Sequence, residues 1–138
     1  MSARTDLAAP EGPDESYDHA YTMLRERRYD EAEKAFKDFL DRYPGHNLAA
    51  NAKYWLGETY YVRGDFEHAA RVFAEGYQQY PKGPKGPDNL LKLGMSLAGL
   101  GKKNDACLTY SQLKKEYPSG SQPILLRAAQ EKDRLGCP

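Results

Sequence analysis

Several features that often decide a protein's function are missing from this sequence. It contains no run of about 18 apolar residues, so no segment predicts a membrane-spanning helix. The 20 Lys and Arg residues balance the 20 Asp and Glu residues, so no net field attracts nucleic acid or an anionic membrane. Residues 1–16 also lack the apolar stretch of a secretion signal. Any partner must therefore be recognised by shape and local chemistry.

The residue types of enzyme and metal sites are present, but not in the patterns that such sites need. His19, His46 and His68 lack i, i+4 pairing and cysteine neighbours, so no metal site is expected. In segment 81–87, PKGPKGP, the prolines remove backbone donors that would hold a phosphate. No histidine or carboxylate is placed by the sequence pattern to activate Cys107 as a nucleophile. We therefore expect no cofactor and no catalytic activity.

A repeat of constant length is the strongest pattern that is present. Tyr-Pro pairs begin at positions 43, 80 and 117, each 37 residues after the one before. At fixed distances before each proline, alanine recurs at 32, 69 and 106, an aromatic residue at 36, 73 and 110, and a small residue at 20, 57 and 94. The chain therefore contains three copies of one unit.

The second half of each unit predicts an amphipathic helix. In the first unit its apolar residues are Ala32, Ala35, Phe36, Phe39, Leu40 and Tyr43. This i, i+3, i+4 spacing places them on one face of a helix. Each such helix should end near its Tyr-Pro pair, because proline lacks a backbone donor and disfavours helical geometry in the residue before it.

The first half of each unit predicts another helix. The start signals are Asp14, either Asn47 or Asn51, and Asp88. The breaks before the second helices fall at Arg28-Tyr29, Gly64-Asp65 and Gly101-Lys102, and they are short enough to predict tight antiparallel hairpins. The recurring small residue, for example Gly57, is expected where the two helices touch. A larger side chain there would hold the partner helix away.

This unit resembles the tetratricopeptide repeat, although its period of 37 exceeds the usual period of about 34. The resemblance covers about residues 14 to 118. It implies an all-α superhelix of three helix-turn-helix repeats, at about 14–44, 47–81 and 87–118.

The ends of the chain depart from the repeat. Residues 121–135 predict a capping helix with Ser121 as its N-cap, so the repeat domain should span 14–136. Glu131 stands where the repeats have a small residue, which is consistent with a cap that has a polar outer face. Residues 1–13 mix Pro, Gly, Ser and acidic residues, and they predict a flexible linker in a fragment of a longer protein.

Two segments carry a closer resemblance. YWLGETYYVRGDFEHAARVF at 54–73 and PDNLLKLGMSLAGLG at 87–101 are similar to the C-terminal repeat domain of the cell division coordinators, also called CpoB or Tol-Pal system protein YbgF. The resemblance runs from about residue 17 to 135. It implies a non-enzymatic periplasmic scaffold of Gram-negative bacteria that binds TolA and a class A penicillin-binding protein. Such a scaffold coordinates peptidoglycan synthesis with outer-membrane constriction during cell division.

The same resemblance bears on oligomeric state. Members of this family carry a secretion signal and an N-terminal coiled coil that trimerises, and neither is found in this sequence. We therefore expect the chain as given to be a monomer. Three alternatives remain open: a repeat component of an outer-membrane protein assembly complex, a generic peptide-binding adaptor, and an element that serves only to oligomerise. The first would need a lipidated cysteine before the repeats, and the second would usually present a basic clamp.

The two cysteines suggest a disulfide but do not require one. Cys107 lies at the start of the sixth predicted helix and Cys137 lies just past the end of the seventh. Antiparallel packing of these helices would bring the thiols together, and an oxidising periplasm would permit the bond. The alternative is that Cys107 is a small core residue and Cys137 a terminal thiol.

The stacked first helices of such repeats are expected to line a concave groove that binds a partner. In this register the groove residues are Tyr17, Asp18 and Tyr21, then Asn51, Tyr54, Glu58 and Tyr61, then Asp88, Leu91, Lys92 and Met95. Aromatic rings with polar rims suit a peptide ligand. Alternatively, Tyr17 and Tyr54 pack between helices. The groove hypothesis predicts that Tyr54→Ala with Glu58→Ala weakens binding to a TolA fragment and leaves thermal unfolding almost unchanged.

Overall fold

The computed structural model describes residues 12–138, and within that range it contains helices and no strand. The helices are α2 (Pro13–Arg25), α3 (Tyr29–Arg42), α4 (Ala49–Val62), α5 (Phe66–Gln79), α6 (Gly86–Gly99), α7 (Lys103–Glu116) and α8 (Gln122–Leu135). The linker predicted for residues 1–13 lies outside the described residues, except for its last two positions.

The structure repeats with the same period as the sequence. Helices α3, α5 and α7 begin at residues 29, 66 and 103, and α4 and α6 begin at 49 and 86. Each of these intervals is 37 residues. The predicted all-α superhelix of three helix pairs and a final helix is therefore confirmed.

The predicted helix ends are close to those observed. Helices α3, α5 and α7 each end one residue before the tyrosine of a Tyr-Pro pair, and that tyrosine is the C-cap. The predicted starts differ slightly, because Asp14 and Asp88 lie within the first turns of α2 and α6 rather than at their N-caps. A carboxylate in the first turn still interacts favourably with the positive end of the helix dipole.

The turn inside each helix pair depends on one residue with a left-handed backbone. Gly64 has φ 78° and Gly101 has φ 77°, and Arg27, at the equivalent position of the first repeat, has φ 64°. Glycine adopts this region at no steric cost, whereas a side chain such as that of Arg27 does so less readily. The first turn therefore lies one residue before the break predicted at Arg28-Tyr29. The sequence does not mark this turn, because arginine stands where the other two repeats have glycine.

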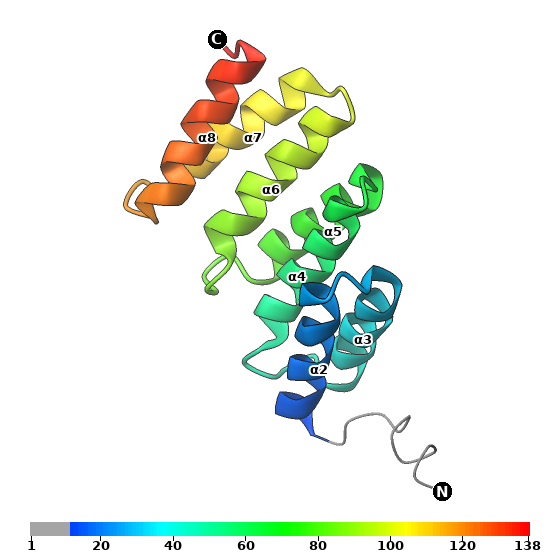
Figure 1. Ribbon diagram of the computed structural model, residues 1–138. Coiled ribbons are helices and arrows are strands. Elements are labelled where there is room, and N and C mark those ends of the chain that lie inside the picture. Colours follow the sequence, from blue (N-terminus) through cyan, green and yellow to red (C-terminus); the bar gives the residue numbers. More distant parts are fainter. Residues whose placement is uncertain (1–11) are drawn as a thin grey trace, which may run out of the picture.

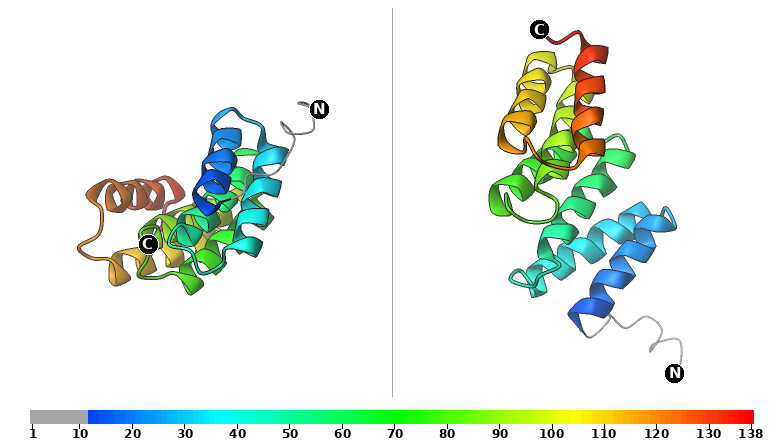
Figure 2. Two further views of the ribbon diagram at one scale, coloured as in Figure 1. Left: turned by 90° about the horizontal axis from the view of Figure 1, so that it is seen from below. Right: turned by 90° about the vertical axis from the view of Figure 1, so that its left-hand side faces the viewer.

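The helices form two rows (Figure 1). Successive members of the inner row, α2, α4, α6 and α8, contact one another. Among the described helices, α3 does not contact α5, and α5 does not contact α7, so the outer row is spread apart. Each outer helix packs instead against the inner helices before and after it. The further views show α8 beside α6 and α7 at the opposite end of the stack from α2 (Figure 2).

Close contact between paired helices depends on the recurring small residue. A Cβ atom added to Gly57 would lie 2.6 Å from Cε1 of Phe73, and one added to Gly94 would meet the ring of Tyr110 in the same way. Both rings are almost fully buried. The expectation that these glycines lie where helices touch is therefore confirmed.

None of the helices in residues 12–138 combines the length and the apolar character that a bilayer-crossing helix needs.

Candidate partner-binding surface

The faces of α2, α4, α6 and α8 that point away from the outer row form what we call the inner surface. Its residues are Tyr21, Asn51, Trp55, Glu58, Tyr61, Asp88, Lys92, Met95, Arg127, Glu131 and Arg134. Tyr17 lies at its border, because its ring also packs against Phe36 and Phe39 of the outer helix α3. The 37-residue period brings equivalent positions of successive repeats to the same side of the stack. Most residues predicted for the groove therefore lie together on one surface, with the exceptions given below.

Aromatic rings make up the N-terminal part of the inner surface. The rings of Tyr17 and Tyr21 are stacked with centroids 6.4 Å apart, and the Tyr21 ring lies 5.2 Å from that of Trp55. Burial raises the pKa of Tyr17, although hydrogen bonds to Trp55 and Asn51 oppose the shift. This part of the surface therefore combines half-buried rings with the neutral hydroxyl of Tyr17, whereas the amide oxygen of Asn51 is buried.

An ion pair crosses the centre of the inner surface. Lys92 Nζ on α6 lies 2.9 Å from Glu58 Oε1 on α4, and the two side chains are only 17% and 19% exposed. Lys92 also lies over the ring of Tyr61, 4.3 Å from its centroid. An ion pair this sheltered from water is screened less than a surface pair and fixes the relative position of the two helices.

Helix α8 forms the C-terminal part of the inner surface. Glu131 is 6% exposed and pairs with Arg127 at 2.8 Å and with Arg134 at 3.6 Å. The pKa of Tyr61 is raised by burial and by the nearby carboxylates of Glu58 and Glu131. The prediction that Glu131 belongs to a polar outer face is therefore wrong. The carboxylate points inward, and its two arginines compensate its burial.

Two residues predicted for the groove are instead part of the core. Tyr54 is 8% exposed and packs against Phe73, with ring centroids 5.6 Å apart, and Leu91 is 6% exposed. Burial strongly raises the pKa of Tyr54, which keeps its hydroxyl neutral. The alternative reading, that Tyr54 packs between helices, is the correct one. Because truncation of a buried aromatic residue is costly, Tyr54→Ala would destabilise the fold, so the proposed double variant cannot test binding alone.

The remaining groove predictions fall at the edges of the inner surface. Asp18 is exposed, whereas Asp88 and Met95 are partly buried. Met95 packs against the C-terminal core cluster, which includes Leu90 and Tyr110. These residues bound the surface rather than form its centre.

Sequence reasoning missed the contributions of Trp55 and of the α8 charges. Trp55 is adjacent to Tyr54 in sequence, and the repeat register assigned Tyr54 and its equivalent Leu91 to the groove. Both of those positions are buried. The i, i+4 spacing of Arg127 and Glu131 was a visible signal of an intrahelical ion pair. What it could not show is that the pair faces inward.

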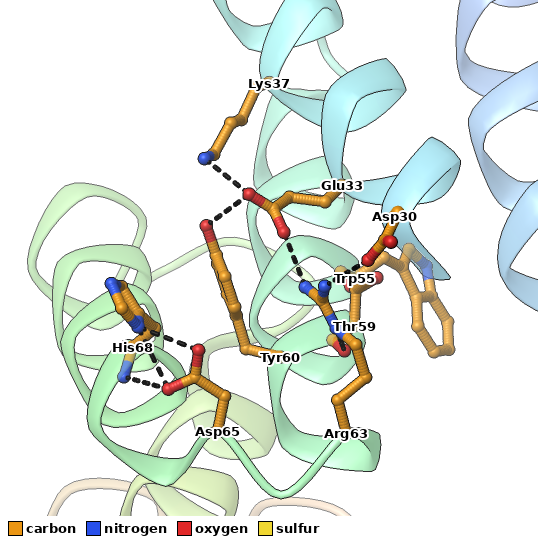
Figure 3. Close-up of polar contacts among 9 residues, drawn as sticks. All are labelled: Asp30, Glu33, Lys37, Trp55, Thr59, Tyr60, Arg63, Asp65 and His68. Atoms are coloured by element: carbon orange, nitrogen blue, oxygen red, sulfur yellow. Dashed lines mark hydrogen bonds and ion pairs between the residues drawn. The ribbon is translucent and has the colours of Figure 1, made fainter. Parts of the chain in front are cut away.

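The outer side of the stack carries a second polar network (Figure 3). Glu33 on α3 accepts hydrogen bonds from Lys37 at 2.7 Å, from Tyr60 at 3.0 Å and from Arg63 at 2.6 Å. Burial opposes ionisation of Glu33, but these three donors outweigh it and lower its pKa to about 2. The network therefore links α3 to α4 between the first and second repeats.

The start of α5 is attached to the same network. Asp65 is the N-cap of α5 and accepts a hydrogen bond from the backbone N–H of His68. Its pKa is lowered by a hydrogen bond with the His68 ring, and that ring stacks on Tyr60 with centroids 5.1 Å apart. His68 therefore has a structural role. Among the described residues, no group of His, Cys, Asp and Glu side chains has the arrangement of a metal site.

The structure joins Cys107 on α7 and Cys137, just after α8, by a disulfide bond. The two residues are 30 positions apart, and their Cα atoms lie 5.7 Å from each other. The bond holds the C-terminal end of α8 against the start of α7, and it thereby fixes the helix that supplies Glu131 to the inner surface.

Comparison with known proteins agrees with this architecture. A tetratricopeptide-repeat model matches residues 17–84, and another tetratricopeptide-repeat model matches residues 88–120. Two curated relatives from Pseudomonas putida, one of them from strain KT2440, are both named cell division coordinator CpoB. Each is 41% identical to this chain over 51 residues, which are 37% of this chain and 19% of the relative.

The match thus spans less than a fifth of the length of each of these relatives. The two repeat models together match most of the chain, and the structure contains the stacked helix pairs that such repeats form. The chain therefore belongs to the tetratricopeptide-repeat family.

Proposed function

We propose that this chain is a non-enzymatic protein-interaction scaffold of the Gram-negative cell envelope. On this proposal it acts in the periplasm as part of the Tol-Pal system. Its inner surface binds TolA and a class A penicillin-binding protein, and it thereby coordinates peptidoglycan synthesis with outer-membrane constriction in cell division. The similarity to cell division coordinator CpoB supports this assignment.

The observation that carries the proposal is the continuous inner surface. Half-buried rings and a sheltered ion pair lie on it in fixed positions, and they come from helices that contact one another in a row. Rigid aromatic side chains provide contact area at low entropic cost, and a preformed surface reduces the ordering that binding requires. These are properties of a surface that recognises protein segments.

The disulfide supports the periplasmic part of the proposal. Bonds such as that between Cys107 and Cys137 persist in oxidising compartments, including the bacterial periplasm, and are rare where thiols are kept reduced. The bond also holds α8 in place, so the complete inner surface depends on an oxidising environment.

The experiment exchanges the two charges at the centre of the inner surface. Glu58→Lys with Lys92→Glu keeps an ion pair between α4 and α6 but reverses its direction. We expect this variant to bind a periplasmic TolA fragment about tenfold more weakly or worse in isothermal titration calorimetry, because electrostatic complementarity would be lost. The same titration is made with the periplasmic region of a class A penicillin-binding protein.

A matched control exchanges an exposed pair on the outer row. Asp38 and Arg42 on α3 are 3.1 Å apart, and Asp38→Arg with Arg42→Asp makes the same kind of exchange away from the inner surface. The control should bind as the unaltered chain does. Equal affinity of both exchanged variants would contradict the inner-surface assignment, and failure of the unaltered chain to bind either partner would contradict the proposed function.

A further inference from the structure

A cavity of about 240 Å³ opens at one edge of the inner surface. It lies between the C-terminal parts of α2 and α4 and reaches the start of α3. Its lining residues are Tyr21, Leu24, Arg25, Arg27, Tyr29, Trp55, Glu58 and Val62. We call it the α2–α4 pocket.

The floor of the α2–α4 pocket is apolar. The rings of Tyr21 and Trp55 both line it, with centroids 5.2 Å apart and an interplanar angle of 60°. Val62, which also lines the pocket, is 42% exposed, so its aliphatic side chain is accessible to a ligand. Binding of an apolar side chain over this aromatic and aliphatic floor is favourable, because it removes apolar surface from water.

The charges of the pocket are unbalanced. Arg25 lies 5.6 Å from the centroid of the Tyr21 ring, and neither Arg25 nor Arg27 forms an ion pair with a carboxylate among the residues that the structure describes. Glu58, the acidic residue of the lining, is already paired with Lys92. The pocket lining therefore carries two positive charges that no carboxylate of residues 12–138 pairs with and one negative charge, Glu58, that is neutralised by Lys92 from outside the lining.

Neighbouring arginines behave differently. Arg28 lies 2.8 Å from Glu31, and Arg63 lies 2.9 Å from Asp30 and 2.6 Å from Glu33. The chain thus supplies carboxylates to the arginines just outside the pocket and none to the two that line it. The charge complementarity that is lacking within the chain can come from a ligand.

The backbone of Arg27 adds an independent indication. Its φ of 64° is the conformation that glycine adopts at the equivalent positions, Gly64 and Gly101. An arginine is less favourable than glycine here, because its Cβ atom crowds the backbone at a positive φ. A residue held in an unfavourable conformation at the rim of a cavity is a reason to look for a function of its side chain.

The size of the pocket limits the ligand. Sites for drug-sized molecules are usually about 300 to 1,000 Å³. A cavity of about 240 Å³ is smaller, and it suits one large side chain of a protein segment.

From these observations we propose that the α2–α4 pocket binds an aromatic or large aliphatic side chain of a partner protein that is followed by an Asp or Glu residue. The apolar side chain covers Trp55 and Tyr21, and the carboxylate pairs with Arg25 and Arg27. This inference rests on the proposed function, because it assigns a recognition element to the same partner-binding surface.

The test uses blocked peptides as probes. The peptides are Gly-Phe-Asp-Gly, Gly-Phe-Asn-Gly and Gly-Ala-Asp-Gly, each acetylated and amidated so that no terminal charge interferes. Trp55 is the one tryptophan of the sequence, so its fluorescence and its indole N–H signal in NMR report on the pocket. We expect the Phe-Asp peptide to bind about fivefold more tightly than either of the others, because each lacks one of the two contacts.

The protein variants separate charge in the pocket from charge elsewhere. Arg25→Gln with Arg27→Gly removes both pocket charges, and glycine suits the positive φ at residue 27. Lys34→Gln with Lys114→Gln is the control, because it removes two exposed charges from the outer helices α3 and α7. The pocket variant should bind the Phe-Asp peptide about fivefold more weakly than the unaltered chain does, and it should bind the Phe-Asn peptide with unchanged affinity. The control variant should bind both peptides with unchanged affinity.

Three outcomes would overturn the inference: equal binding of the Phe-Asp and Phe-Asn peptides, equal losses in the two variants, or sedimentation in which the unaltered chain self-associates and the pocket variant does not. A chain that binds the TolA fragment but none of the peptides would disprove the pocket and leave the proposed function intact. A chain that binds the Phe-Asp peptide but neither envelope partner would uphold the pocket and disprove the proposed function.

Discussion

At the scale of single residues, Gly57 and Gly94 determine how closely the paired helices approach. Alanine at either position places a Cβ atom against a buried ring, that of Phe73 or of Tyr110. Overpacking of this kind costs about 1 to 3 kcal/mol, and the higher helix propensity of alanine offsets at most about 1 kcal/mol. We therefore expect Gly57→Ala and Gly94→Ala each to lower the free energy of unfolding by about 1 to 2 kcal/mol in urea titrations.

Gly45→Ala is the matched control, because nothing lies within 4 Å of a Cβ added at that position. Its unfolding midpoint should stay close to that of the unaltered chain. If Gly57→Ala were equally harmless, the ring of Phe73 would have to move freely, and the close helix contact would not depend on the missing side chain.

Arg27 is the opposite case, a position where glycine would be the more favourable residue. Arg27→Gly removes the cost of a side chain at φ 64°. Glycine also loses more backbone entropy on folding, so the net gain is smaller than the full conformational cost. We expect a rise of about 0.5 kcal/mol in the free energy of unfolding, measured by urea titration. Gly64→Arg should do the reverse, and a loss of stability in Arg27→Gly would show that the arginine side chain stabilises the fold.

At the scale of elements, the Glu33 network joins α3 to α4. The pKa of Glu33 is lowered to about 2, below its ordinary value of 4.5, so the folded state favours the ionised carboxylate. Its contribution to stability is therefore complete above about pH 4.5 and is lost as the pH falls toward 2. Glu33→Gln should lower the free energy of unfolding by about 1 to 2 kcal/mol at neutral pH, because Arg63 and Lys37 lose their charged acceptor.

Thermal unfolding between pH 7 and pH 2 checks this prediction. The difference in melting temperature between the unaltered chain and Glu33→Gln should shrink as the pH falls below about 4.5. Glu67→Gln, which changes an exposed carboxylate in the first turn of α5, serves as the control and should show a smaller difference, because it loses only the interaction with the helix dipole. A gap between Glu33→Gln and the unaltered chain that stays constant down to pH 2 would contradict the assigned pKa direction.

The elements were largely predictable from the sequence, and the side chains on them were less so. Tyr-Pro pairs and recurring small residues report directly on backbone requirements, namely a missing donor and a close approach, so the repeats and their boundaries followed. Tyr54 and Glu131 were misplaced because spacing along one helix gives a face but not what covers it. Whether a residue at the edge of a helix face is buried or exposed depends on how closely the neighbouring helix covers it. The crossing angle of the two helices decides this, and the local sequence does not specify that angle.

At the scale of the whole molecule, stability should be graded along the stack. In such repeats each unit contacts mainly its neighbours, so the central helices are supported from both sides and the terminal ones from one. Helices α4, α5 and α6 pack against helices before and after them, whereas α2 and α8 lie at the two ends. Helix α8 has few buried residues, Ala128 and Glu131, and it depends on the disulfide for its attachment.

Native-state hydrogen exchange should therefore show a gradient, with the slowest exchange in α4 to α6 and faster exchange in α2 and α8. Reduction of the Cys107–Cys137 disulfide removes about 3.6 kcal/mol of loop-closure stabilisation, and this loss should appear mainly as faster exchange in α8 and the adjacent part of α7. Exchange in α2 and α3 should be unaltered, because no contact links them to α8. A uniform increase over all helices would mean that the described chain unfolds as a single cooperative unit, since loss at one end would then be transmitted through every interface to the other.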